Sequence, residues 1–272
     1  MTDPGPGPRA GPVTVSVEDR VAVVTIDRPE VRNALSGDVL AALADAVLDL
    51  DRDHRVGAVV LTGRDPAFCA GFDLRMLSMS PAGAPPRGSG VTGDQVPSSQ
   101  RGLLPEHRVP IVGAVNGPAV TGGLELALGC DFLVASERAS FADTHARVGA
   151  MPGAGLTIRL PELVGIDRAR RMSMTGDFVD ARRAYEWGLV TEVVPHEELL
   201  PRARALAGAI ASIPAEYVRE VRRMYDEIGG LAGRAAWRRE YELARQWMAE
   251  RFDRERLASE RAGIVERGRS QA

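Results

Sequence analysis

Short apolar runs separated by turn-forming residues dominate the first part of the chain. Residues 13–17 and 21–27 are rich in Val and Thr and predict a β-hairpin with residues 18–20 as its turn. The next strands are predicted at residues 57–62, 111–115, 132–135 and 189–194, and the first two of these are continuous apolar runs. Because these two runs lack polar alternation, we expect their strands to be buried in a sheet, with residues 57–62 covered on both faces.

Apolar residues at helical spacing predict the segments between the strands. Ser36 is expected to cap a helix that carries Leu40, Leu43 and Val47 on one face. Asp180 is expected to cap a short helix that ends at a glycine, and further helices are predicted at residues 124–128, 156–160 and 168–174. The alternation of strand, glycine-bearing turn and helix predicts a parallel α/β arrangement with right-handed crossovers.

The pattern divides the chain into three parts. Residues 1–12 are rich in Pro and Gly and are expected to be disordered, residues 13–196 form the α/β core, and residues 197–272 are helical only. An apolar stripe along this helical region predicts that it packs on the core or on another subunit. Residues 79–100 are rich in Pro, Gly and Ser and predict a surface loop, either a lid over the site or a passive insertion.

Composition narrows the class of protein. The 34 basic and 37 acidic residues give a net charge of -3, so neither nucleic acid nor an anionic membrane is expected as a partner. The two cysteines, Cys69 and Cys130, offer no disulfide framework and no metal-ligand spacing. With no signal-peptide pattern and no apolar run of membrane-spanning length, we predict a cytoplasmic protein of enzyme size without a metal site.

The candidate chemistry lies around Glu125, a carboxylate in an apolar run that follows the glycine turn 121–123. A second turn, residues 70–71, also follows the carboxyl end of a strand, so both turns are expected to face one site. Amides at a helix start lack partners, and an acid beside such donors can move a proton while the donors hold a negative oxygen. The alternative is that Glu125 only stabilises the helix, since a Glu in the first helical turn complements the helix dipole.

Five ordered segments carry more specific motifs. They are RPEVRNALS (residues 28–36), LTGRDPAFCAGFDL (61–74), PIVGAVNGPAVTGGLELALGCD (110–131), ASFADTHARVGAMPGAG (139–155) and TGDFVDARRAYEWGLVTEVV (175–194). Together they resemble the enoyl-CoA hydratase/isomerase (crotonase) superfamily, most of all its enoyl-CoA hydratases. The resemblance implies an α/β fold, a crotonase-like spiral of ββα units, with a C-terminal helical region that assembles the chain into a homotrimer or a hexamer of two trimers.

The resemblance also implies a reaction and a site. The substrate would be an acyl-CoA thioester, with no separate cofactor because coenzyme A is part of the substrate. Water would add across the 2,3 double bond of a 2-enoyl-CoA through an enolate, with Glu125 as acid/base and the backbone amides of Ala70 and Gly122 as the oxyanion hole. The residues implied near the CoA portion are Arg32, Ala34, Gly71, Phe72 and Asp73.

One position departs from the hydratase pattern. Hydratases of this superfamily carry a second glutamate in an F-x-x-P-E sequence, where this chain has Phe141 to His145. A neutral imidazole can accept or donate a proton, so His145 either shares the acid/base work or only lines the pocket. Asp143 either orients that imidazole or, in an extended segment, points to the opposite face. Thr121 also replaces a usual glycine.

Other functions stay open at this point. The same fold hosts isomerase, hydrolase and decarboxylase reactions on acyl-CoA, and a nucleophilic route would have Cys69 as its candidate, although no histidine is paired with it in the sequence. A non-catalytic acyl-CoA-binding protein is the alternative from another class. Retention of Glu125 in an apolar run favours an enzyme, because a buried carboxylate without a function is costly.

Overall fold

A computed structural model describes residues 11–73 and 101–229 of the chain. The predicted disordered start falls largely outside these residues, and the predicted loop at 79–100 and most of the predicted C-terminal helical region lie outside them. The chain divides into two compact units, Met1–Arg219 and Glu220–Ala272. The predicted domain boundaries at residues 12 and 196 stay predictions.

The larger of two sheets has six strands in the order β1-β2-β3-β4-β6-β9. The first two strands form an antiparallel hairpin, as predicted, and Asp19 and Arg20 in its turn both have positive φ, at 47° and 66°. All other pairings in this sheet are parallel. The strands are β1 (Val13–Glu18), β2 (Val21–Ile26), β3 (Ala58–Gly63), β4 (Ile111–Val115), β6 (Phe132–Ser136) and β9 (Glu192–Val194).

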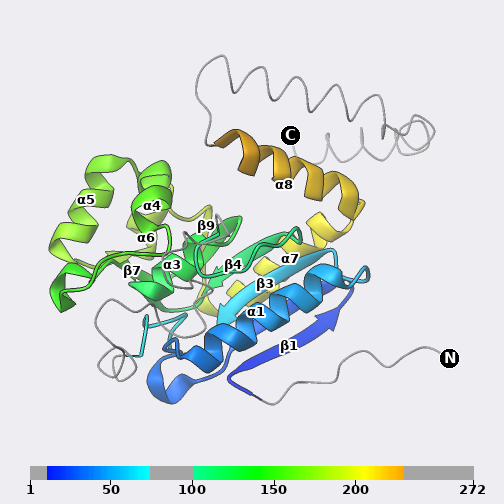
Figure 1. Cartoon of the computed structure of the whole chain (residues 1–272), viewed down its shortest axis with the longest axis horizontal. Helices are drawn as coiled ribbons and strands as arrows, with labels where there is room; N and C mark the ends of the chain where they lie inside the picture. The colour runs from blue at the N-terminus through cyan, green and yellow to red at the C-terminus, as the bar shows by residue number, and fades with distance from the viewer. Residues whose placement is uncertain (1–10, 74–100, 230–272) are drawn as a thin grey trace. The chain divides into compact units, whose positions relative to one another are not determined.

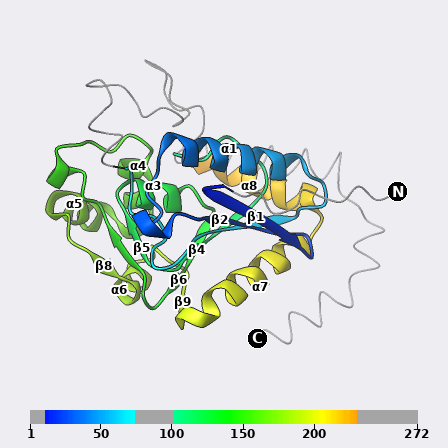
Figure 2. The same ribbon diagram turned by 90° about the horizontal axis from the view of Figure 1, so that it is seen from below.

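Helices cover both faces of this sheet, as Figure 2 shows for α1 (Gly37–Arg52) and α7 (Leu199–Ala211). The predicted cap of α1 is present, since the Ser36 hydroxyl accepts a hydrogen bond from the amide of Val39 over 3.4 Å. Leu40 and Leu43 of α1 pack into the core on one face, while Ala203 of α7 packs against the other. The continuous apolar runs of β3 and β4 are therefore buried on both faces, where the sequence predicted two covered faces for β3 and a buried strand for β4.

A second, small sheet was not predicted from the sequence. It consists of β5 (Pro118–Val120), β7 (Ser140–Ala142) and β8 (Val179–Asp180), with β7 in contact with both others. Cys69 forms an isolated parallel bridge with Ala119 of β5. This sheet therefore joins three segments that are far apart in the sequence.

The helices α3 to α6 gather around the small sheet (Figure 1). Helix α3 (Gly122–Leu128) follows β5 directly and packs on α4 (Leu156–Val164), which in turn packs on α5 (Ile166–Thr175). Asp180 caps α6 (Ala181–Glu186) by accepting the Arg183 amide at 2.8 Å, as predicted. Three single-turn 3-10 helices are η1 (Pro29–Val31), η2 (Ala146–Val148) and η3 (His196–Glu198), and the last described helix is α8 (Ala215–Gly229).

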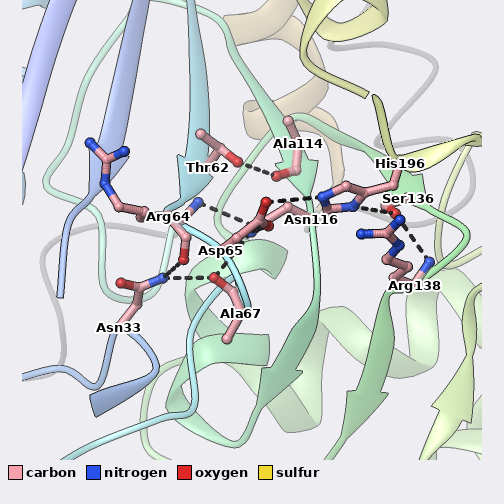
Figure 3. Close-up of polar contacts among 11 residues, drawn as sticks. Asn33, Thr62, Arg64, Asp65, Ala67, Ala114, Asn116, Ser136, Arg138 and His196 are labelled. Atoms are coloured by element: carbon pink, nitrogen blue, oxygen red, sulfur yellow. Dashed lines mark hydrogen bonds and ion pairs between the residues drawn. The ribbon is translucent and has the colours of Figure 1, made fainter. Parts of the chain in front are cut away.

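A polar network closes the carboxyl ends of four strands of the large sheet (Figure 3). Asn116, directly after β4, donates to the Asp65 carboxylate over 2.8 Å and accepts the amide of Gly63 over 3.3 Å. His196 lies between Asp65 and the Ser136 hydroxyl, with 3.0 Å from each ring nitrogen to its partner. This network holds the end of the sheet together without any contribution from Glu125 or His145.

Candidate active site

The small sheet brings the glycine turn beside the segment that carries His145. Val120 of β5 is paired with Ala142 of β7, and the amide of Thr121 donates to the Ala142 carbonyl over 2.8 Å. Thr144 lies two residues beyond the end of β7, and its hydroxyl lies 2.6 Å from the Thr121 hydroxyl. The two segments are thus fixed side by side by backbone and side-chain hydrogen bonds.

Glu125 lies in the first turn of α3 and is 1% exposed. Its Oε1 accepts hydrogen bonds from the amides of Gly153 at 3.2 Å and Ala154 at 2.9 Å. Gly102, at φ +64°, packs against the loop that contains Gly153 and Ala154, and a Cβ on Gly102 would lie 2.4 Å from the Ala154 carbonyl oxygen. Because Oε1 is held in this way, Oε2 is the oxygen available for chemistry.

His145 faces Glu125 across a short gap. Its Nε2 lies 3.9 Å from Glu125 Oε2, and the residue is only 5% exposed. Its Nδ1 lies 2.6 Å from Asp143 Oδ1, which also accepts the His145 backbone amide over 3.2 Å. The structure excludes the alternative in which Asp143 points away, because the chain leaves its extended conformation and reaches helical backbone angles at His145, φ -52° and ψ -49°.

The electrostatics of the two carboxyl groups differ. Burial raises the pKa of Glu125, and the amides of Ala154 and Gly153 and the nearby His145 only partly offset it. Burial also acts to raise the pKa of Asp143, but the hydrogen bonds from the side chains of His145 and Ser173 and from the His145 amide together outweigh it, and the pKa lies below its ordinary value. Asp143 is therefore a fixed anion near neutral pH, whereas Glu125 is closer to the point at which it can take up a proton.

Three backbone amides of the two glycine turns are candidate donors, and two of them have no hydrogen-bond partner among the residues that the structure describes. The Ala70 amide, which the resemblance implies as an oxyanion donor, donates to the Arg32 carbonyl over 3.0 Å. The amides of Phe72 and Gly122 carry no hydrogen bond within the described part of the chain. The parallel bridge of Leu35 to Phe72 explains the position of the Phe72 amide. Leu35 bonds to the Gly71 carbonyl and the Asp73 amide, so the Phe72 amide points away from Leu35.

The two glycine turns meet, as the sequence predicted. A Cβ on Gly71, whose φ is +96°, would lie 3.5 Å from the Gly122 amide nitrogen. A Cβ on Gly122 would lie 2.8 Å from two ring carbons of Phe72, and one on Gly123 would lie 2.0 Å from the Cys69 carbonyl oxygen. At Gly71 and Gly123 a neighbouring carbonyl oxygen lies too close for a side chain, whereas at Gly122 the Phe72 ring fills the space that a side chain would need.

The residues implied at the CoA portion lie together on the loop after β2 and on the turn after Cys69. Arg32 has left-handed backbone angles, and its carbonyl holds Ala70, while the Ala34 carbonyl accepts a hydrogen bond from the Arg28 guanidinium over 2.9 Å. Asn33 was not predicted, yet it is fully buried and donates to the carbonyls of Arg64 and Ala67, both over 2.7 Å. Asn33 thereby fixes the loop after β2 against the segment that follows β3 and leads to the Gly71 turn.

Cys69 does not offer a nucleophile. The side chain is fully buried, and burial raises the pKa of its thiol to about 12. Cys130 is buried as well, and the pKa of its thiol is also raised. At neutral pH both cysteines are uncharged core residues, which disfavours a route through a covalent thioester on the protein.

The fold and the site define an α/β protein in which a buried glutamate faces a histidine next to two glycine turns. The family model for enoyl-CoA hydratase/isomerase matches residues 16–256 of the chain. A probable peroxisomal enoyl-CoA hydratase of Arabidopsis thaliana is 41% identical over 190 residues, which cover 70% of this chain and 69% of that protein. A crotonyl-CoA hydratase of Syntrophomonas wolfei is 39% identical over 202 residues, 74% of this chain and 75% of that protein.

The structural comparison agrees. The crystal structure of an enoyl-CoA hydratase from Mycobacterium smegmatis superposes with a TM-score of 0.71 at 45% identity, over 88% of this chain and 99% of that chain. The chain therefore belongs to the enoyl-CoA hydratase/isomerase family. The superfamily and the crotonase fold predicted from the five motifs are confirmed.

Proposed function

We propose that this chain is an enoyl-CoA hydratase, which adds water across the 2,3 double bond of a 2-enoyl-CoA. One observation carries the proposal: Glu125 Oε2 and His145 Nε2 face one another at 3.9 Å, and the helix of Glu125 begins at Gly122, whose amide has no partner in the described part of the chain. An acid/base pair that flanks a pair of oxyanion donors suits chemistry at the α- and β-carbons of a thioester. The membership in the family and the names of the two relatives support the same substrate class.

The gap between the two side chains suits one water molecule. Hydrogen bonds to oxygen are about 2.8 Å long, so one water beside the pair can contact both atoms when these lie less than about 5.6 Å apart. In the proposed step the Glu125 carboxylate removes one proton of this water as its oxygen bonds to C3. The proton on Glu125 then passes to C2, and His145 Nε2 accepts a hydrogen bond from the second hydrogen of the water, which directs its lone pair at C3.

The thioester oxygen becomes negative as the water adds. We propose that the amides of Gly122 and Phe72 hold this oxygen, since neither has a partner among the described residues and the turns that carry them approach one another at Gly71 and Gly122. Ala70 contributes instead by its hydrogen bond to Arg32, which holds the turn against the loop after β2. Removal of one oxyanion donor typically costs about 3–4 kcal/mol of transition-state stabilisation.

The CoA portion is assigned to the loop after β2 and the Gly71 turn. Arg32 and Asp73 are the charged members of this group, and Ala34, Gly71 and Phe72 supply backbone and apolar contact. The reaction as proposed needs no cofactor and no metal, since coenzyme A enters with the substrate.

The test follows the loss of the conjugated enoyl-thioester absorbance with short- and medium-chain 2-enoyl-CoA. Wild type is expected to turn over, and Glu125→Gln is expected to lose roughly 10²- to 10⁴-fold in kcat. His145→Ala is expected to lose activity as well, with little change in the affinity for the CoA moiety. Wild type that binds acyl-CoA without consuming the enoyl chromophore would contradict the proposal in favour of a binding protein.

The proposal also covers the oligomeric state of the protein and its location in the cell. We propose a homotrimer or a hexamer in the cytoplasm, because the described part of α8 leaves Val221 and Tyr225 54% and 78% exposed and so offers apolar surface to another subunit. No helix among the described residues has the length and apolar character to cross a bilayer. Light scattering at defined protein concentration tests the assembly, and a monomer throughout would contradict it.

A further inference from the structure

Asp143 is the second carboxylate of the site, and neither the motifs nor the relatives assign it a role. It is 1% exposed, and it lies between the end of β7 and His145. Its Oδ1 meets two donors of the same residue, the Nδ1 of His145 at 2.6 Å and the His145 backbone amide at 3.2 Å. A single oxygen thus fixes both the backbone and the ring of His145.

This contact decides which ring nitrogen carries the proton. A carboxylate oxygen only accepts hydrogen bonds, so a 2.6 Å contact requires a hydrogen on Nδ1. In the neutral ring Nε2 is then unprotonated, and this is the nitrogen that lies 3.9 Å from Glu125 Oε2. An unprotonated Nε2 can accept a hydrogen bond from a water that also donates to Glu125, whereas the opposite tautomer would place an N–H there.

We propose that Asp143 is a positioning residue that holds His145 in the Nδ1–H tautomer, with its bare Nε2 aimed at the water bound by Glu125. The role of the water rests on the proposed hydratase function, whereas the tautomer itself does not. Asp143 takes no proton and touches no substrate. Thr144, the residue between the two, anchors this short turn to Thr121 through the 2.6 Å hydroxyl contact.

A second Asp–His pair in the same chain provides a matched control. Asp65 contacts the Nε2 of His196 at 3.0 Å, while the Nδ1 of His196 meets the Ser136 hydroxyl (Figure 3). That pair belongs to the network at the end of the large sheet and uses the opposite ring nitrogen. Asp65→Asn therefore perturbs an Asp–His pair without touching the proposed catalytic groups.

The experiment combines nitrogen NMR of the histidine rings with kinetics on wild type, Asp143→Asn, Asp143→Ala and Asp65→Asn. Wild type is expected to show His145 as the Nδ1–H tautomer. The Ala variant is expected to show a mixture of tautomers and a loss of roughly 10²- to 10⁴-fold in kcat with KM within about threefold. The Asn variant, which keeps an oxygen acceptor, should lie between the two, and Asp65→Asn should change the His196 signals only.

The two readouts separate this proposal from the proposed function. If wild type does not hydrate enoyl-CoA, the hydratase proposal fails, and the ring signals still decide the role of Asp143. An unchanged His145 tautomer in folded Asp143→Ala overturns the inference. So does a mixed tautomer in that variant with kcat within twofold of an active wild type.

Discussion

The hydroxyls of Thr121 and Thr144 lie 2.6 Å apart and join the glycine turn to the segment of His145. Thr121 has backbone angles of φ 53° and ψ -112°, which residues other than glycine rarely adopt. Such a conformation costs on the order of 1–3 kcal/mol and persists only where the surroundings impose it. The hydroxyl pair is one contact that offsets this cost, and it joins the turn before the helix of Glu125 to the segment that carries His145.

The first prediction concerns this pair. Thr121→Val and Thr144→Val should each lower the free energy of unfolding by about 1 kcal/mol, because each leaves the other hydroxyl without its partner. A double-mutant cycle measured by urea denaturation should give a coupling energy of about 1 kcal/mol. Additive effects of the two substitutions would show that the contact contributes nothing.

The second prediction concerns the close approach of Gly122 to Phe72. Gly122→Ala should lower kcat by at least about tenfold, because its Cβ would lie 2.8 Å from the Phe72 ring and must displace the side chain of the residue that carries the second donor. Gly208→Ala on α7 is the matched control, since no atom lies within 4 Å of its Cβ position. That control should keep full activity and equal or greater stability. Full activity of Gly122→Ala would argue against the assigned oxyanion hole.

The third prediction distinguishes Phe72 from Ala70 as the second donor. Replacement of a single residue by its α-hydroxy acid turns one amide into an ester and removes only the N–H. The ester at position 72 should lower kcat by roughly 10²- to 10³-fold with a small change in melting temperature. The ester at position 70 should lower the melting temperature, because the bond to Arg32 is lost, while kcat changes little. The reverse pattern would restore Ala70 as the donor.

The fourth prediction is the pH dependence of stability. The pKa of Glu125 is raised in the folded state, chiefly by burial, so the folded protein binds its proton more tightly than the unfolded chain does. This contribution to stability is fully present below the unfolded pKa and is lost as pH rises through the folded pKa. Glu125→Gln keeps an oxygen for the Gly153 and Ala154 amides and should therefore exceed wild type in stability near about pH 8.

The advantage of Glu125→Gln should shrink as pH falls from about pH 8 toward the ordinary titration range of a glutamate, because wild type takes up its proton before that range is reached. Urea denaturation of both proteins across this range measures the difference. An advantage of the variant that stays constant with pH, or a variant less stable than wild type at every pH, would contradict the assignment.

The sequence predicted those parts of the fold that carry local signals. The buried runs of β3 and β4, the Ser36 and Asp180 caps and the turn at Asp19 and Arg20 each depend on a few neighbouring residues, and each is present. Glu125 was singled out from the glycine turn before a periodic apolar run, Gly122 was assigned as a donor from the family resemblance, and both roles stay predictions.

The small sheet could not be predicted in this way. Its strands have three, three and two residues, too few to show an alternating pattern, and they are held by pairing with distant segments. For the same reason the sequence left the direction of Asp143 open, because the turn between β7 and η2 decides it. The amides of Gly153 and Ala154 on Glu125, and the engagement of the Ala70 amide by Arg32, also depend on contacts between remote loops.

The most direct test of the central claim is mass spectrometry of the product formed from crotonyl-CoA in ¹⁸O-labelled water. The proposed mechanism predicts an intact CoA thioester that is heavier by one labelled water molecule, with the label on C3, formed by wild type and not by Glu125→Gln. Release of free coenzyme A with label in the carboxylate would indicate a thioester hydrolase. Unlabelled product or unchanged substrate would also contradict hydration at this site.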